Sequence, residues 1–179
     1  MKHSQITKKN RLGRVLWGIA YYLLFRTSFR TWFRWRRFLL QMLGASVAAD
    51  SRVYRTARVW APWNLKMASG SCIGDCVDCY NVDLIQLGEN AVVSQYSFLC
   101  TASHDYEDPS FPLMTAPIDI QNRVWVAADV FVGPGVSLAE GTVVLARSTV
   151  LHSTKPWGVY GGYTASRLKG RDPTKFVGD

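Results

Sequence analysis

Aliphatic residues recur at every sixth position over much of the chain. The second half of this pattern is uninterrupted, and its members are Ile120, Val126, Val132, Leu138, Val144 and Val150. The first half, which contains two slips of two residues, comprises Val47, Val53, Val59, Met67, Ile73, Cys79, Leu87, Val93 and Leu99. A period of six fits neither the 3.6-residue period of a helix nor an unbroken two-residue alternation. The pattern therefore predicts short strands joined by corners, with one inward side chain on each side of a coil.

Stacked coils of this kind would pair every strand in parallel with the coils above and below, so that backbone groups are satisfied and the inward side chains form ladders. Small residues that directly follow inward positions are expected to allow the tight bends; they are Ala48, Ala68, Gly74, Gly88, Ala127, Gly133 and Ala139. The alternative, an antiparallel β-sandwich, needs hairpin turns such as Asn-Gly about every 8–12 residues, and the sequence contains no Asn-Gly. We predict a parallel β-helix over residues 47–153.

Residues 1–46 form a basic, aromatic-rich arm for which helical structure is predicted. Aromatic residues recur at three- to four-residue spacing beside a stripe of arginines; the aromatic residues are Tyr21, Phe25, Phe29 and Trp32 or Phe33, and the arginines are Arg26, Arg30, Arg34 and Arg37. Thr27 or Ser28 is expected to cap a helix that Gly44 ends, with Gly18 and Thr27-Ser28 marking a bend. Two interpretations remain open: residues 36–46 plug the open end of the β-helix, and residues 1–35 bind an anionic membrane surface.

The net positive charge of the protein comes from this arm. Ten Lys and Arg residues and no Asp or Glu precede Asp50, whereas the remainder carries 11 basic and 13 acidic residues. A uniformly basic surface for nucleic acid is therefore excluded. With 179 residues the chain has the length of one domain. The apolar run over residues 15–25 is followed by Arg26 and Arg30 where a leader peptide would be cleaved, so we expect a cytoplasmic protein, peripheral at most to the inner face of the membrane.

The cysteines are Cys72, Cys76, Cys79 and Cys100. A second pair of ligands at zinc-finger spacing is missing, so we expect reduced, structural thiols and no metal. The repeat is interrupted once, between Thr101 and Pro117, by a segment with three prolines. Long insertions in compact folds are usually functional or disordered, and the prolines favour an ordered loop.

The stretches over residues 124–138 and 143–150 resemble the hexapeptide-repeat acyltransferases. The segment Leu-Cys-Thr-Ala-Ser-His-Asp-Tyr, residues 99–106, is similar to sugar O-acetyltransferases of the colanic acid biosynthesis acetyltransferase family. This resemblance, over roughly residues 36–171, implies a mainly β fold, the left-handed parallel β-helix, with a short C-terminal helix or tail in residues 154–179. It also implies acetyl-CoA as co-substrate, a sugar or saccharide acceptor, and a homotrimer with active sites between neighbouring subunits.

Transfer of an acetyl group to a hydroxyl needs a base, because an alcohol is a poor nucleophile near neutral pH. His104 matches the catalytic histidine of the family; the alternative is that it only hydrogen-bonds a loop carbonyl. Asp105 and Tyr106, in the same motif, are assigned to the substrate. Asn81 matches an acceptor-side position, although asparagine is also common at corners because it tolerates a left-handed backbone.

The coenzyme side of the site is assigned from the same resemblance. Trp125 matches a tryptophan beside the thioester end of coenzyme A, with lateral packing as the alternative. Ala128 and Ala146 match positions along which the pantetheine arm runs. The basic residues Arg167, Lys169 and Arg171 are candidates for the nucleotide phosphates, or for a solvated tail. The Asn-Pro pair that the family has in this segment is replaced by Tyr163 and Thr164.

The leading hypothesis is acetyl-CoA-dependent O-acetylation of a glycan, nucleotide-sugar or lipid-linked saccharide. N-acetylation of an amino sugar is a second enzymatic hypothesis. A non-catalytic β-helix scaffold is the alternative from a different class. A zinc enzyme with three histidine ligands in one subunit is improbable, because the chain has three histidines in total and His3 lies in the polar N-terminus.

Overall fold

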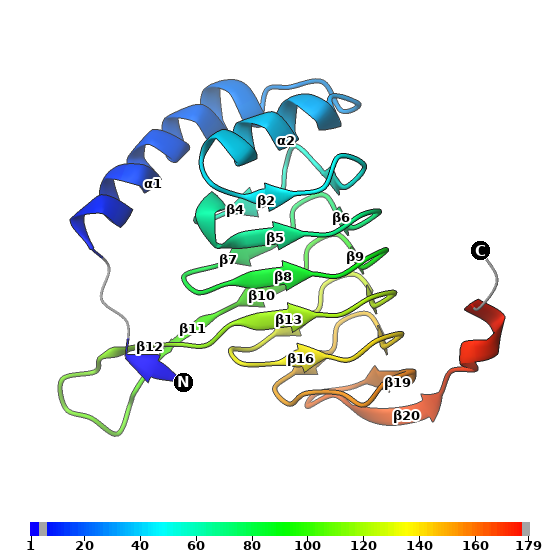
Figure 1. Ribbon diagram of the computed structural model, residues 1–179. Coiled ribbons are helices and arrows are strands. Elements are labelled where there is room, and N and C mark those ends of the chain that lie inside the picture. The colour runs from blue at the N-terminus through cyan, green and yellow to red at the C-terminus, as the bar shows by residue number, and fades with distance from the viewer. Residues whose placement is uncertain (4–6, 177–179) are drawn as a thin grey trace.

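The structure, a computed structural model, describes residues 1–3 and 7–176. Its body is a parallel β-helix whose coils stack along one axis (Figure 1). Three sheets form its sides. The first sheet contains β2 Ser46–Val47, β5 Leu65–Met67, β8 Ile85–Leu87, β13 Ile118–Ile120 and β16 Ser137–Leu138. The second contains β3 Arg52–Val53, β6 Cys72–Ile73, β9 Val92–Val93, β14 Trp125–Val126, β17 Val143–Val144, β19 Gly158–Gly161 and β20 Ser166–Gly170. The third contains β4 Arg58–Val59, β7 Asp78–Tyr80, β10 Phe98–Cys100, β15 Phe131–Val132 and β18 Thr149–Val150.

The hexad ladder predicted from the sequence is confirmed by the strand register. Val47, Met67 and Leu87 are successive partners in the first sheet, and equivalent pairs run down the second and third sheets. All fifteen inward positions are buried, and the most exposed of them, Val47, is 6% exposed. The first slip in the repeat is filled by the 3-10 helix η2, Pro62–Asn64. Because the slips fall at corners, they leave the ladders intact.

The small residues beside the inward positions have a different role from the one expected. Gly74 and Gly88 do not have a left-handed backbone; a Cβ on Gly88 would lie 2.7 Å from the backbone nitrogen of Asn122 in the next coil. They are small because the coils approach closely there. The left-handed bends lie three residues after inward positions, at Gly70, Cys76, Asn90, Tyr96, Arg123, Asp129, Gly135, Gly141 and Arg147.

The N-terminal helices cover the open end of the β-helix (Figure 1). They are α1 (Lys8–Ala20), the π-helix η1 (Tyr21–Phe25) and α2 (Phe33–Met42). Trp17, Tyr21 and Phe25 belong to the same buried cluster as the ladder residues. The cap thus includes the part of the arm before residue 36 as well as the part after it.

Four side chains of this cap hydrogen-bond the edge of the first coil. Each coil donates N–H groups to carbonyls of the next, as Arg52 does to Ser71 at 2.8 Å, so the carbonyls of the first coil have no preceding coil to accept from. They accept instead from Trp17 (Val59 O, 2.6 Å), Arg36 (Val53 O, 2.7 Å), Arg37 (Ser51 O, 2.8 Å) and Gln41 (Val47 O, 2.8 Å). The cap therefore satisfies polar groups that a bare sheet edge would leave unpaired.

The predicted helix start at Thr27 or Ser28 is wrong. The N-cap residue of α2 is Trp32, without a side-chain cap bond, and the buried Ser28 hydroxyl instead donates to Phe25 O and accepts from Arg36. Gly44, with φ of 91°, follows the end of α2 as predicted. Among the described residues, no helix is long and apolar enough to cross a membrane.

Both ends of the chain add strands that the sequence did not predict. β1 (Lys2–His3) joins the interrupting loop, where it pairs antiparallel with β12 (Leu113–Thr115), which in turn pairs with β11 (Ala102–His104). At the other end, β19 begins a sixth coil and β20 folds back on it. The short helix η3 follows at Pro173–Phe176.

Candidate functional site

His104 ends strand β11, which follows β10 of the third sheet and leaves the body of the β-helix as a hairpin with β12. Its Nδ1 lies 2.8 Å from the carbonyl oxygen of Phe111, and its ring stacks on the Phe111 ring with centroids 4.6 Å apart. A carbonyl oxygen can only accept, so Nδ1 carries the proton. The neutral imidazole then presents a lone pair at Nε2 on an exposed side chain. The loop-carbonyl bond and the role of a base are therefore compatible.

The neighbours of His104 in the motif do not orient its ring. The carboxylate of Asp105 accepts from the backbone N–H of Glu107, and the Asp105 N–H donates to Pro112 O. Tyr106 is exposed at the tip of the hairpin. Phe111, which holds the imidazole by a hydrogen bond and by stacking, was not singled out from the sequence. Only the hairpin pairing of β11 with β12 brings it to His104.

Asn81 lies inside a corner. Its side chain is fully buried, its Oδ1 accepts from the backbone N–H groups of Trp60 and Ala61, and its Nδ2 donates to Ala61 O at 2.6 Å. These bonds fit the corner alternative, since they hold the chain where the first slip occurs. The amide has little capacity left for a sugar hydroxyl.

Trp125, Ala128 and Ala146 lie on and beside the second sheet. Trp125 is half-exposed on β14, where its Nε1 donates to the Ser94 hydroxyl at 3.0 Å. Ala128 and Ala146 occupy the same place in successive coils, two residues after the inward Val126 and Val144, at the corner between the second and third sheets. This corner edge is lined by small side chains and backbone.

The three basic residues near the C-terminus differ in how they are engaged. Arg167 and Lys169 are exposed on β20. The Arg171 guanidinium instead donates to Gly141 O at 2.8 Å and lies 4.4 Å from the centroid of the Phe176 ring. Arg171 is thus held by the fold, whereas Arg167 and Lys169 are accessible cations on the same sheet as Trp125.

The predicted base and the predicted coenzyme residues lie on different edges of one chain. His104 leaves the β-helix where the third sheet passes to the first, and the coenzyme residues lie on the second sheet and at its corner with the third. In Figure 1 the β11–β12 hairpin projects from one side of the body, β19 and β20 lie at the end of the stack away from the helices, and the segment after β20 extends from the opposite side. The structure therefore does not bring the predicted base and the predicted coenzyme residues together on one face of the chain.

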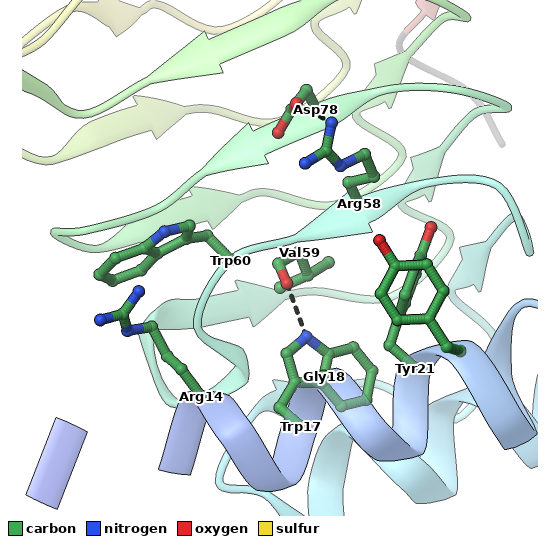
Figure 2. A pocket seen from close by; sticks show the side chains of 9 residues that line it. Arg14, Trp17, Gly18, Tyr21, Arg58, Val59, Trp60 and Asp78 are labelled. Atoms are coloured by element: carbon green, nitrogen blue, oxygen red, sulfur yellow. Dashed lines mark hydrogen bonds and ion pairs between the residues drawn. The ribbon is translucent and has the colours of Figure 1, made fainter. Parts of the chain in front are cut away.

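A cavity that sequence reasoning missed lies between α1 and the third sheet (Figure 2). Its volume is about 200 Å³, and it is lined by Arg14, Trp17, Gly18, Tyr21, Tyr22, Arg58, Val59, Trp60 and Asp78. Arg58 and Asp78 form an ion pair at 3.4 Å, and the Arg14 guanidinium lies over the Trp60 ring at 4.2 Å. Burial raises the pKa of the Asp78 carboxyl, and Arg58 opposes this shift. The outward residues beside Val59 and Cys79, which are Arg58, Trp60 and Asp78, could have indicated one wall of this cavity from the sequence. The position of α1, which forms the other wall, could not be derived from the sequence.

A column of aromatic rings continues from this cavity along the third sheet. Trp60 lies 5.6 Å from Tyr80, Tyr80 lies 6.4 Å from Phe98, and Phe98 lies 5.6 Å from Phe131, all between ring centroids. β10, which carries Phe98, leads directly to His104. The cavity, the column and the His104 hairpin therefore belong to one surface.

No protein-family model matches the chain. The chain is 38% identical over 144 residues to the colanic acid biosynthesis acetyltransferase WcaF of Escherichia coli (strain K12), and the alignment covers 80% of this chain and 79% of the relative. The chain belongs to the WcaF family of acetyltransferases.

Solved structures agree in fold with this WcaF-family chain. A maltose O-acetyltransferase from Clostridium difficile 630 superposes with a TM-score of 0.87 at 20% identity, covering 96% of this chain and 93% of the other. A hexapeptide-repeat acetyltransferase from Vibrio cholerae O1 biovar eltor, complexed with acetyl coenzyme A, gives 0.86 at 20% identity, covering 96% and 94%. The predicted fold class, a left-handed parallel β-helix, is confirmed.

The thiols of this WcaF-family protein are free and mostly protected. Cys79 is an inward ladder residue, and complete burial raises the pKa of its thiol far above the usual range. Burial also raises the pKa of Cys72 and Cys100. Within residues 1–3 and 7–176, no group of three or more His, Cys, Asp and Glu side chains has the arrangement of a metal site.

Proposed function

We propose that the protein transfers the acetyl group of acetyl-CoA to a hydroxyl of a saccharide, with His104 as general base. The observation that carries this proposal is the Nδ1–H bond to Phe111 O at 2.8 Å, because it fixes the tautomer whose Nε2 accepts a proton. Membership of the WcaF family supports the acetyl transfer. The acetyl coenzyme A complex of the Vibrio cholerae protein with the same fold supports the co-substrate.

In this reaction Nε2 of His104 takes the proton of the acceptor hydroxyl while the hydroxyl oxygen attacks the carbonyl carbon of the thioester. The bond between the carbonyl carbon and sulfur then breaks, and the imidazolium returns the proton to the departing thiolate. The products are the acetyl ester and free coenzyme A. The Phe111 carbonyl stabilises the imidazolium that forms between these steps, because it accepts from Nδ1–H throughout.

For the coenzyme we propose the second sheet and its corner with the third. The exposed Ala146 and half-buried Ala128 would let the pantetheine arm approach the backbone, with Trp125 beside the thioester. Arg167 and Lys169 would contact the phosphates as accessible cations. Arg171 would support them indirectly, because its guanidinium already bonds Gly141 O.

For the acceptor we propose the third sheet, from the cavity of Figure 2 to the His104 hairpin. Aromatic rings with a few convergent polar groups are typical of small-ligand sites, and here Trp60 provides the ring and Arg58 and Asp78 the polar groups. Asp105 and Tyr106 would contact the acceptor from the hairpin. Asn81 would act as a positioning residue that holds Trp60 in place.

The test is a coenzyme A thiol-release assay with a panel of neutral sugars, uronic acids, nucleotide-sugars and amino sugars. His104→Ala should lower turnover by about 10²- to 10⁴-fold, as expected for loss of a general base. His152→Ala, which removes an exposed histidine elsewhere, is the matched control and should remain active. Trp60→Ala should raise the KM for the acceptor and leave that for acetyl-CoA unchanged.

Near-normal turnover by a folded His104→Ala protein would refute the base assignment. Mass spectrometry of the products distinguishes an ester from an amide. If only amino sugars are acetylated, and as amides, the N-acetylation hypothesis replaces the O-acetylation hypothesis. If calorimetry detects no binding of coenzyme A to the protein, the transferase proposal is excluded and the hypothesis of a non-catalytic scaffold is favoured. A homotrimer with sites shared between subunits is a further part of the proposal, and it rests on residues other than His104.

A further inference from the structure

Helix α1 is apolar on two faces. One face packs on the β-helix through Trp17 and, beyond the helix end, Tyr21. The other consists of large apolar side chains at positions i, i+3, i+4 and i+7 of α1, which share one side of a helix; they are Leu12, Val15, Leu16 and Ile19, and Leu23 of η1 is exposed beyond them. The least exposed of these five, Leu16, is 54% exposed. A surface helix normally turns such a stripe toward a core, so this one lacks a partner in the described chain.

The exposed stripe has basic residues at its ends. Lys8 lies one turn before Leu12, Arg26 lies about one turn after Leu23, and Arg11 flanks the stripe; all three are exposed. No Asp or Glu occurs before Asp50. An apolar helical face with basic residues and no acidic ones is complementary to an anionic lipid surface, which attracts Lys and Arg while the apolar side chains enter the interface.

The rest of this end of the molecule has the same character. Helix α2 buries Arg36, Leu39 and Leu40 against the first coil and exposes Arg34 and Phe38. An apolar groove of about 580 Å³ adjoins the stripe, lined by Thr7, Asn10, Leu12, Gly13, Leu16, Leu43 and Trp63. The apolar surface thus continues from α1 toward the start of the β-helix.

We infer that the N-terminal end of the protein docks on an anionic membrane surface through the exposed face of α1. The helix lies in the plane of the interface, with Leu12, Leu16 and Ile19 among the acyl chains and Lys8 and Arg26 at the headgroups. Trp17 and Tyr21 keep the helix on the β-helix at the same time, so docking needs no unfolding of the cap. This inference is independent of His104 and of acetyl transfer.

The experiment is flotation of the full-length protein with vesicles of phosphatidylcholine and phosphatidylglycerol, against vesicles of phosphatidylcholine alone. The protein should float with the anionic vesicles at low salt and less so at high salt. Leu16→Glu with Ile19→Glu should lower the bound fraction by about tenfold or more, because two carboxylates enter the apolar face. Leu151→Glu with Leu168→Glu makes the same change in net charge at residues 48% and 58% exposed elsewhere, and should float like the parent.

Circular dichroism and the thiol-release assay without vesicles monitor folding and activity separately from docking. Absence of flotation with anionic vesicles overturns the inference, as does flotation of Leu16→Glu with Ile19→Glu equal to that of the parent. If the parent does not bind vesicles, and Leu16→Glu with Ile19→Glu has a different mass from the parent in sedimentation, the face is an interface between copies of the chain. Loss of acetylation with intact flotation would count against the proposed function alone.

Discussion

Arg36 is a fully buried guanidinium that joins the cap to the β-helix. Its Nε donates to Val53 O, and its two other nitrogens donate to Ser28 Oγ, Phe29 O and Arg30 O at 2.8–2.9 Å. Burial lowers the pKa of this group, but an arginine remains charged at neutral pH. The planar fork thus connects the first coil to the turn between η1 and α2 through one side chain.

Replacement of Arg36 by Met should lower the free energy of unfolding by about 2–5 kcal/mol, because it leaves several buried oxygens without a donor. Arg34→Met is the matched control, since Arg34 is exposed on the same helix, and should change the value by less than about 0.5 kcal/mol. Urea unfolding at one protein concentration measures both. Equal stability of the two variants would contradict the role given to Arg36.

At the scale of elements, the ladders were predictable because each inward residue obeys a local rule with a period of six. The cap was only half predictable. Helix α1 carries apolar residues on two faces, so its pattern does not say which face meets the β-helix; the structure selects Trp17 and Tyr21. The cavity and the Phe111 contact of His104 were not predictable, because they join segments that lie far apart or within an irregular loop.

At the corners, the predicted period of six is correct, but the role predicted for the small residues is wrong. Small residues after the inward positions were expected to make bends, but the bends lie two residues further on, where Asn90 and Asp129 have φ of 56° and 59°. Backbone hydrogen bonds hold the strands of stacked coils about 4.8 Å apart. Gly88 is small because this spacing leaves no room for a side chain.

Two glycines test this explanation. Gly88→Ala should destabilise the protein by about 1–3 kcal/mol, because the new Cβ would lie 2.7 Å from backbone of the next coil. Gly18→Ala should stabilise it by up to about 1 kcal/mol, since Gly18 lies in α1 with nothing within 4 Å of an added Cβ. Thermal unfolding of both variants measures the difference. A neutral Gly88→Ala would mean that the coils separate at little cost.

At the scale of the whole molecule, the proposed homotrimer would place its three subunits around one axis. The His104 hairpin projects from one side of the body, and β20 with Arg167 and Lys169 lies at the end of the stack away from the helices (Figure 1). In such a trimer we expect a threefold rotation to bring the hairpin of one subunit toward the proposed coenzyme residues of the next. If the axis runs along the stack of coils, all three capped ends face the same way, and three α1 faces meet one membrane together.

Mixing two inactive variants tests this assembly directly. His104→Ala leaves the coenzyme edge intact, and Ala146→Trp, at an exposed residue, should block the pantetheine arm while leaving His104 intact. If each site combines His104 of one subunit with Ala146 of its neighbour, random trimers formed from equal amounts contain about a quarter of competent sites. Co-refolding the variants should therefore recover about 25% of parental thiol release, with sedimentation of the mixture at the mass of a trimer. A site contained within one chain would recover none, because every chain in the mixture then carries one of the two lesions; an active monomer in sedimentation would contradict the shared site in the same way.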